Sequence, residues 1–273
     1  MAERFSIAEP VTWHGVGVHT GEQCAATVLP GASGLQVLCS NRLYPICSAE
    51  VVDVTRCTGL RLGDRSILTV EHLLSALNGL GITDAVLEVD GPEVPILDGS
   101  ALPFAEALQG VGRQRLGPTA LSEVDAVEVT MGESCVRVTR GTGCLEVSIA
   151  YEHAAIGRQR LSIALTPNAY LAELAPARTF GLLEDAERLR AMGLALGASL
   201  DNTLVFSSEG PLAPPRFPDE PVRHKALDII GDLALSGLSI YDLTVRAERP
   251  GHAINVEAAR RLRGNDTARE DGD

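Results

Sequence analysis

Aromatic residues are scarce in this sequence, and no stretch of it stays apolar for long. Phe, Trp and Tyr make up 4% of the 273 residues, so a hydrophobic core must be built mainly from Leu, Val, Ile and Ala. No run approaches the roughly 18 consecutive apolar residues of a membrane-spanning helix. The N-terminal residues 1–6 contain no apolar secretory segment. The sequence therefore predicts a cytoplasmic protein without an integral membrane segment.

Positive charge is also in deficit. The chain has 23 Lys and Arg residues against 36 Asp and Glu residues, which gives a formal net charge of −13. Such a charge disfavours nonspecific binding to nucleic acid or to an anionic membrane surface. We expect no nucleic-acid partner, although local basic groups can still hold a phosphate.

The six cysteines form no Cys-x-x-Cys pair, a common spacing of zinc-binding cysteines. In a cytosolic chain of this length we predict reduced thiols rather than disulfides or zinc ligands. The cysteines are Cys24, Cys39, Cys47, Cys57, Cys135 and Cys144.

Short strands followed by helices occupy the first part of the chain. Residues 4–65 alternate short apolar segments with turn residues, which is typical of strands. A helix is predicted over 69–78, followed by a strand at 85–89, a constrained loop at 92–99 and a helix at 103–108. This order indicates an α+β unit.

The same order begins again after residues 110–118, which are rich in Gly and Arg and predict a domain boundary. The predicted strands are 127–130, 135–138, 145–149, one after 156–161, 203–206 and 241–248. The predicted helices are 167–174, 184–192, 222–236 and 254–263.

The fold class that follows is α+β, with two similar α+β domains that each combine a small sheet with helices. We assign residues 1–115 to the N-terminal domain and 116–264 to the C-terminal domain. Residues 265–273 are acidic and polar, which predicts a disordered tail. The repeated order suggests an ancient duplication as a hypothesis.

The predicted helix around residues 222–235 carries chemistry as well as a buried stripe. Its apolar residues recur at three- and four-residue steps. His224 and Asp228 are four residues apart and lie on one face, and Asp232 continues the same row. Such a pair is more often a hydrogen-bonded surface pair, since a metal site needs three or more ligands.

A second helix signal far upstream supplies a third candidate ligand. Thr69 could cap this helix and Gly79 could end it, which places Glu71 and His72 in the first turn. His72, His224 and Asp228 together fit a catalytic zinc with an open position. Glu71 is then free to take a proton from a bound water. In the alternative interpretation Glu71 caps its helix and His72 is a core or surface histidine.

Seven motifs in a fixed order also carry a resemblance to a known family. They are Gly-Val-Gly-Val-His-Thr-Gly (15–21), Thr-Val-Glu-His-Leu-Leu-Ser-Ala-Leu (69–77), Pro-Glu-Val-Pro-Ile-Leu-Asp-Gly-Ser-Ala (92–101), Ala-Arg-Thr-Phe-Gly (177–181), Leu-Gly-Ala-Ser-Leu-Asp-Asn (196–202), Val-Arg-His-Lys-Ala-Leu-Asp-Ile-Ile-Gly-Asp-Leu (222–233) and Gly-His-Ala-Ile-Asn (251–255). From about Pro10 to Leu262 the chain resembles the zinc-dependent UDP-3-O-acyl-N-acetylglucosamine deacetylases of lipid A synthesis. The resemblance implies two α+β domains with their helices packed between two outer sheets.

The resemblance also implies a set of catalytic roles. His72, His224 and Asp228 hold the zinc, which iron could replace, and Glu71 serves as general base. His252 is the acid that protonates the departing amine, and Asp232 holds its imidazole in the protonated form. Thr179 donates its hydroxyl to the developing oxyanion.

The implied substrate is an acylated UDP-amino-sugar, and the resemblance implies contacts with its nucleotide diphosphate and with its acyl chain. Lys225 would lie near the nucleotide diphosphate, and an insert at about 182–205 would line an acyl-chain passage. Phe180 and Leu194 would be apolar contacts, or alternatively plain core. Two further candidates are His19, which is either a turn residue or a phosphate contact, and Arg158, which either meets substrate or caps a strand.

The expected activity is hydrolysis of the N-acetyl group by a cytoplasmic, zinc-binding hydrolase, with release of acetate. Two departures from the family pattern, the proline-rich segment 211–217 and Pro221, bear on substrate fit. The alternatives are a zinc deacetylase of a different N-acetylated sugar and a non-catalytic binding protein on the same fold. A monomer is expected, but nothing in the sequence fixes the oligomeric state or the acyl-chain length.

Overall fold

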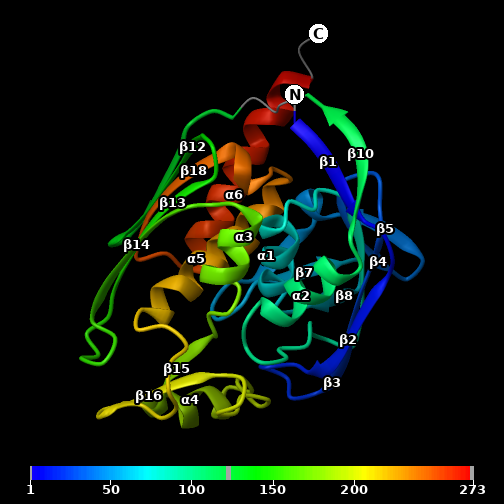
Figure 1. Cartoon of the computed structure of the whole chain (residues 1–273). Helices are drawn as coiled ribbons and strands as arrows, with labels where there is room; N and C mark the ends of the chain where they lie inside the picture. The colour runs from blue at the N-terminus through cyan, green and yellow to red at the C-terminus, as the bar shows by residue number, and fades with distance from the viewer. Residues whose placement is uncertain (1, 121–123, 271–273) are drawn as a thin grey trace.

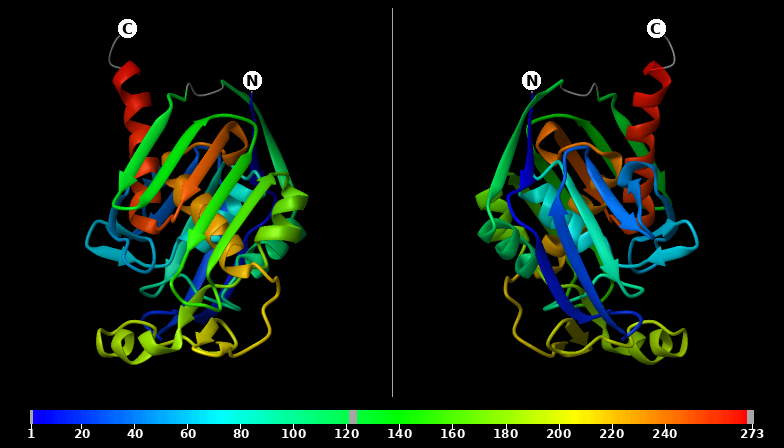
Figure 2. Two further views of the ribbon diagram at one scale, coloured as in Figure 1. Left: turned by 90° about the vertical axis from the view of Figure 1, so that its left-hand side faces the viewer. Right: turned by 90° about the vertical axis from the view of Figure 1, so that its right-hand side faces the viewer.

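Two five-stranded sheets form the outer layers of the molecule, and helices fill the space between them (Figure 1). The computed structural model describes residues 2–120 and 124–270. In Figure 2 each view at right angles to Figure 1 looks onto one of the two sheets, with the helices behind it. This arrangement confirms the predicted α+β fold with helices between two sheets.

The first sheet is built from the N-terminal half of the chain. Its strands, in spatial order, are β2 (Val11–Val16), β3 (Gln23–Pro30), β9 (Ala85–Asp90), β4 (Leu35–Cys39) and β5 (Arg42–Pro45). All neighbours are antiparallel except β4 and β9, which are parallel. Residues alternate between buried and exposed along β3 and β9, as expected for strands that cover a core with one face.

The second sheet repeats this arrangement with the C-terminal half. Its strands are β11 (Val127–Met131), β12 (Ser134–Arg140), β18 (Leu243–Glu248), β13 (Cys144–Ala150) and β14 (Arg158–Ala164). Again all neighbours are antiparallel except the third and fourth, β18 and β13. The strand order and the strand directions therefore match position by position, which supports the duplication hypothesis.

The helices also occupy matching places in the two halves. In each half one helix precedes the central strand and another follows it. They are α1 (Glu71–Gly79) and α2 (Leu102–Gly110) in the first half, and α5 (Glu220–Leu233) and α6 (His252–Glu270) in the second. The helix α2 packs on β2, while α5 and α6 pack on the second sheet.

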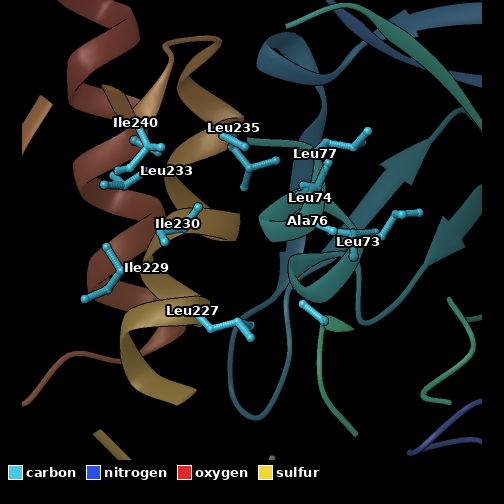
Figure 3. Packing of buried hydrophobic residues seen from close by; sticks show 14 of the residues in the cluster. Leu73, Leu74, Ala76, Leu77, Leu227, Ile229, Ile230, Leu233, Leu235 and Ile240 are labelled. Atoms are coloured by element: carbon cyan, nitrogen blue, oxygen red, sulfur yellow. The ribbon is translucent and has the colours of Figure 1, made fainter. Parts of the chain in front are cut away.

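The helices α1 and α5 pack directly against each other in the centre of the molecule. Figure 3 shows Leu227 and Leu235 pointing from the second half toward α1, whereas Ile229 points toward α6. Every residue of α1 is buried, and Leu73, Leu74 and Leu77 are fully inaccessible. Both helices are therefore held by apolar contacts on more than one side.

An insert precedes the first helix of each half. The first comprises a 3₁₀ turn, η1 (Ile46–Ser48), and a three-stranded sheet of β6 (Glu50–Asp53), β7 (Gly59–Leu62) and β8 (Arg65–Ile67). The second contains α3 (Pro167–Ala169), η2 (Tyr170–Leu174), β15 (Phe180–Leu182), η3 (Leu183–Asp185), α4 (Ala186–Ala191), β16 (Leu204–Ser207) and β17 (Gly210–Pro211). Its yellow-green part, with α4 and β16, projects from one end of the molecule (Figures 1 and 2).

A two-stranded ribbon of β1 (Ala2–Ile7) and β10 (Arg113–Thr119) connects the halves. The boundary predicted between residues 115 and 116 falls inside β10, and β1 pairs with both sides of it. The division into domains 1–115 and 116–264 therefore stays a proposal. Two short 3₁₀ turns, η4 (Ala234–Ser236) and η5 (Ile240–Asp242), lead from α5 to β18.

Three details at helix ends differ from the sequence-based expectations. Thr69 has a φ of 58° and donates its hydroxyl to Glu93 Oε1 (2.6 Å), so it does not cap α1. Gly79 is the last residue of α1, but the left-handed backbone that often ends a helix falls at Gly81, which has a φ of 69°. Glycine is needed at position 79 for packing, because a Cβ there would lie 2.5 Å from the ring of Tyr170. The helix α6 begins at His252, two residues before the predicted start.

The backbone of α6 continues to Glu270, whereas the sequence predicts a disordered tail from residue 265. Residues 265–270 contain no proline, so nothing in them removes a backbone donor from the helix. Residues 271–273 lie outside the described residues, and the prediction stays untested there.

The remaining predictions on composition agree with the structure. None of the six cysteines, all of which lie in the described part of the chain, forms a disulfide. Among the described residues, no helix is both long enough and apolar enough to cross a membrane. The single tryptophan, Trp13, packs edge-on against Phe104 with ring centroids 5.1 Å apart, and its indole N–H donates to Pro103 O (3.2 Å).

Candidate active site

A cavity of about 450 Å³ lies where the helices of both halves meet the two inserts. Its walls come from the starts of α1 and α6, from α5, and from residues 54–56 and 179–185 of the inserts. Arg56 of the first insert and Asp185 of the second form an ion pair beside it (3.6 Å). The cavity therefore depends on both halves of the molecule.

His72, His224 and Asp228 come together in this cavity, although the two histidines are 152 positions apart in the chain. Asp228 Oδ1 lies 3.3 Å from His224 Nε2 and 4.0 Å from His72 Nε2. One candidate ligand atom from each residue lies within 4.8 Å of the others. All three side chains are buried, so they form a compact donor set of two nitrogens and one oxygen.

The charges of these groups suit a cation. Burial lowers the pKa of His72 to about 3 and also lowers the pKa of His224, so both imidazoles are neutral near pH 7. Burial alone would raise the pKa of Asp228, but His224 and Lys225 hold it well below its usual range. Asp228 Oδ1 is buried and makes no hydrogen bond. Two neutral imidazoles and a carboxylate with one unpartnered oxygen fit a divalent metal ion.

The close approach of α1 and α5 positions these three side chains. A Cβ at Gly231 of α5 would lie 2.0 Å from the carbonyl oxygen of Glu71, so only glycine allows the helices to come this near. His224 is oriented separately, since its Nδ1 donates to Ala177 O (3.0 Å). That bond leaves Nε2 as the nitrogen that faces Asp228.

Glu71 lies next to His72 in α1 but points to different partners. Its Oε2 accepts from the backbone N–H of Thr58 (3.0 Å), and its Oε1 is 3.9 Å from His252 Nε2. Burial raises the pKa of Glu71 to about 8, with a smaller opposing effect from His252. A carboxyl group with a pKa near neutrality can accept and release a proton at physiological pH.

His252 forms a buried pair with Asp232. His252 Nδ1 is 3.0 Å from Asp232 Oδ2, which also accepts from Asn255 Nδ2 (2.9 Å). Burial would lower the pKa of this imidazole, but Asp232 raises it to about 9. His252 therefore carries a proton at neutral pH and can donate it.

The other predicted site residues fall into two groups. Thr179, Phe180 and Lys225 line the cavity. The ammonium group of Lys225 donates to Asp228 Oδ2 (2.9 Å) and lies 5.9 Å from the centre of the Phe180 ring. Outside the cavity lining are Leu194, which is half-buried, His19, which is buried, and Arg158, which is exposed.

Several residues that support the site were not identified from the sequence. Glu220 is fully buried and accepts from the backbone N–H and the guanidinium of Arg178, whose guanidinium also donates to Pro214 O (2.9 Å). This pair fixes the segment that carries Ala177 O and Thr179. Thr58 contacts both Glu71 and Asp232. Only Arg178 lies in a motif that the sequence singled out.

A donor set that fits a cation, placed beside a proton acceptor and a proton donor, is the arrangement by which metal-dependent hydrolases activate water. The fold and the cavity define a protein of that class. The chain belongs to the UDP-3-O-acyl N-acetylglycosamine deacetylase family, whose model matches residues 4–264.

Curated relatives agree with this assignment over almost the whole chain. Proteins of Brucella ovis, Brucella canis and Brucella suis, each named UDP-3-O-acyl-N-acetylglucosamine deacetylase, are 40% identical to it over 282 aligned residues. The alignments cover 98% of this chain and 98% of each relative.

Proposed function

We propose that this protein hydrolyses the N-acetyl amide of UDP-3-O-acyl-N-acetylglucosamine and releases acetate, a step of lipid A biosynthesis. Membership of the family and the names of the relatives support the substrate. The observation that carries the chemistry is the cavity, where His72, His224 and Asp228 lie beside Glu71 and the His252–Asp232 pair.

The metal proposed for the site is zinc, with ferrous iron as the alternative. The ligands would be His72, His224 and Asp228, whose unpartnered Oδ1 supports the assignment. When bound, the metal would polarise the amide carbonyl and lower the pKa of a coordinated water from about 16 toward 7.

The side chains around this site would divide the proton transfers between them. Glu71 takes a proton from the attacking water, and Oε1 is the oxygen free to do so because Oε2 is bonded to Thr58. His252 gives its Nε2 proton to the departing amine while Asp232 stabilises the imidazolium. Thr179 would donate its hydroxyl to the charge that develops on the amide oxygen, a contribution of roughly 3 kcal/mol.

Substrate binding would use the rest of the cavity. Lys225 is a phosphate contact in this proposal, and Phe180 is an apolar contact. Leu194 and the 182–205 insert would take the acyl chain, with His19 and Arg158 as outer contacts of the nucleotide. Leu194, His19 and Arg158 lie outside the lining of this cavity.

Acetate release from the purified, zinc-loaded protein tests the function. Wild-type protein should deacetylate UDP-3-O-acyl-N-acetylglucosamine, and His224→Ala should not. Activity on a different N-acetylated sugar alone would favour the related-deacetylase alternative, and tight substrate binding without acetate release would favour a binding protein. Cell fractionation and size-exclusion chromatography test the proposed cytoplasmic location and monomeric state.

A further inference from the structure

Thr58 connects the two halves of the catalytic machinery. It stands immediately before β7 in the first insert and is fully buried. Two backbone bonds fix it against the start of α1: its carbonyl accepts from Val70 N (3.1 Å), and its N–H donates to Glu71 Oε2 (3.0 Å). Its hydroxyl reaches the second half, where Oγ1 lies 2.6 Å from Asp232 Oδ1 and 3.3 Å from His252 Nδ1.

Counting protons at this hydroxyl determines how His252 is protonated. A hydroxyl carries one proton, and an ionised carboxylate can only accept. The short contact therefore runs from Thr58 to Asp232, and the Thr58 oxygen offers only lone pairs to His252. The second neighbour of His252 Nδ1 is Asp232 Oδ2, which is also an acceptor (3.0 Å). Since both neighbours of Nδ1 accept, Nδ1 keeps its proton and Nε2 is the nitrogen that exchanges one.

The backbone of Thr58 makes a matching choice at Glu71. Its N–H occupies Oε2, which leaves Oε1 as the oxygen 3.9 Å from His252 Nε2. Thr58 therefore uses two different bonds, one from its backbone and one from its hydroxyl, to orient the two proton carriers. In this orientation Glu71 Oε1 and His252 Nε2 face each other.

We propose that Thr58 is a positioning residue for deacetylation, which keeps Glu71 Oε1 and His252 Nε2 as the two atoms that exchange protons with the substrate. This inference rests on the proposed function, in which Glu71 is the base and His252 the acid. Thr58 acts through Asp232, His252 and Glu71 and need not touch the substrate.

Thr58→Val tests the hydroxyl alone, because valine has nearly the same shape and keeps the backbone N–H that bonds Glu71. With zinc-loaded enzyme and UDP-3-O-acyl-N-acetylglucosamine, we expect kcat to fall about 10- to 100-fold, the effect of losing a hydrogen bond to a charged group. KM and zinc content should not change, and Thr58→Ser should recover kcat to within about threefold. The matched control is Thr12→Val, which removes an exposed threonine hydroxyl from β2 and should leave all values unchanged.

A double-mutant cycle shows whether Thr58 works through Asp232. If it does, Thr58→Val should add little to the loss caused by Asp232→Asn. Three results would each overturn the proposal. The first is a wild-type kcat in Thr58→Val, and the second is a full additional loss of kcat when Thr58→Val is combined with Asp232→Asn. The third is a Thr58→Val variant in which zinc content and KM change together with kcat.

The pKa of His252, measured by NMR titration of zinc-loaded protein, gives a test that does not need turnover. Asp232 and Asp228 of α5 and Glu71 of α1 are the carboxylates that act on this imidazole. Thr58→Val removes the donor to Asp232 at 2.6 Å, so the carboxylate should hold the Nδ1 proton more strongly. The weaker contact at 3.3 Å acts in the opposite direction, and we expect a net rise of about 0.5 to 1 unit in the pKa of His252.

The two measurements separate the two ideas. A wild-type protein that releases no acetate would count against the proposed function, while the titration would still test Thr58. A pKa for His252 that is the same in wild type, Thr58→Val and Thr58→Ser would overturn the role of Thr58 whatever the activity.

Discussion

Asp228 is the residue at which stability and chemistry conflict most directly. It is a carboxylate with 1% of its surface exposed, and its Oδ1 makes no hydrogen bond. An ionised oxygen buried without a partner costs several kcal/mol. Lys225 compensates only through the other oxygen, Oδ2. A cation at Oδ1 would remove this conflict and would account for the charge that is buried in the site.

His224→Ala should weaken zinc binding by on the order of 10²-fold or more. It removes one of three proposed ligands, and this loss should exceed the roughly 10- to 100-fold effect of removing a residue that only supports a ligand. Metal analysis of the purified variant measures the loss. The matched control is His153→Ala, a half-buried histidine outside the cavity lining, which should keep its zinc. Full zinc retention in folded His224→Ala would refute the ligand assignment.

The pH dependence of kcat/KM should be bell-shaped. His252 must be protonated to act as acid, so activity should fall as the pH rises through its pKa of about 9. Glu71 must be ionised to act as base, so activity should fall on the acidic side. The pKa values of both groups, about 8 for Glu71 and about 9 for His252, apply without a metal ion. A bound cation would lower both pKa values and move both limbs to lower pH.

Two variants assign these limbs. Glu71→Gln and His252→Ala should keep zinc and lose about 10²-fold or more in kcat. His252→Ala should also lose or shift the alkaline limb. If His252→Ala kept both the wild-type rate and that limb, the proton donor would have to be Glu71 or another group.

The sequence predicted which residues lie together in the cavity where chemistry and spacing coincide. Glu71 and His72 share one helical turn, and His224, Asp228 and Asp232 share one helical face, so their grouping needed only helix geometry. Thr58 and Asp232 are 174 positions apart, and nothing local distinguishes Thr58 from other threonines before a strand. Its role depends on a long-range contact that a single sequence does not reveal.

Among the elements, the crossing of α1 and α5 has the greatest effect on the site. The crossing distance is set by Gly231, which leaves room for the Glu71 carbonyl. A side chain at this position would push apart the two helices that carry all three proposed metal ligands.

Gly231→Ala should therefore reduce the free energy of unfolding by about 1 to 3 kcal/mol, the usual cost of overpacking, and zinc affinity should fall with it. Urea denaturation and metal titration measure the two effects. Gly110→Ala is the matched control, because a Cβ there meets no atom within 4 Å at the end of α2. It should be neutral or up to about 1 kcal/mol more stable. Unchanged zinc affinity in Gly231→Ala would show that helix spacing does not set the site.

Element boundaries were predicted less well than the elements themselves. The strong helical period of residues 222–236 matches α5 and the following turn. Thr69 looked like a helix cap, but Glu93, a distant partner, takes its hydroxyl. At the other central helix, α5, one of the backbone N–H groups of the first turn is also bonded by a distant residue: Gln159 Oε1 accepts from Val222 N (3.1 Å). Long-range partners at helix ends override local capping preferences.

For the whole molecule, the decisive fact is that the proposed ligands come from both halves. His72 belongs to the first half, and His224 and Asp228 belong to the second. A metal ion bound to all three would stabilise the association of α1 with α5 and, through it, the complete fold.

Removing the metal with a chelator should lower the melting temperature. The stabilisation is about 4 kcal/mol when free metal exceeds its Kd a thousandfold, and it disappears without metal. Differential scanning calorimetry at several zinc concentrations measures the effect, and His224→Ala should not respond to zinc. An unchanged melting temperature after complete metal removal would contradict a ligand set shared between the halves.

The overall architecture was predictable because each half shows strands before helices. The insert strands β6 to β8 and β15 to β17 could not be separated from the main sheets, since a short apolar run does not reveal its neighbour. The parallel pairs β4–β9 and β13–β18 also join strands that are not adjacent in sequence. Topology of this kind is set by the common core, which runs from Ile7 to Leu262 through both halves.

The single tryptophan makes the molecule an asymmetric optical reporter of its own unfolding. Trp13 lies in β2 and packs against Phe104 of α2, so its fluorescence reports on the first half, whereas far-ultraviolet circular dichroism responds to both halves. Because α1 and α5 share one core, we expect the two signals to change at the same denaturant concentration. Different midpoints would show that the halves unfold one after the other, and fluorescence alone would then leave the half with His224, Asp228 and His252 unobserved.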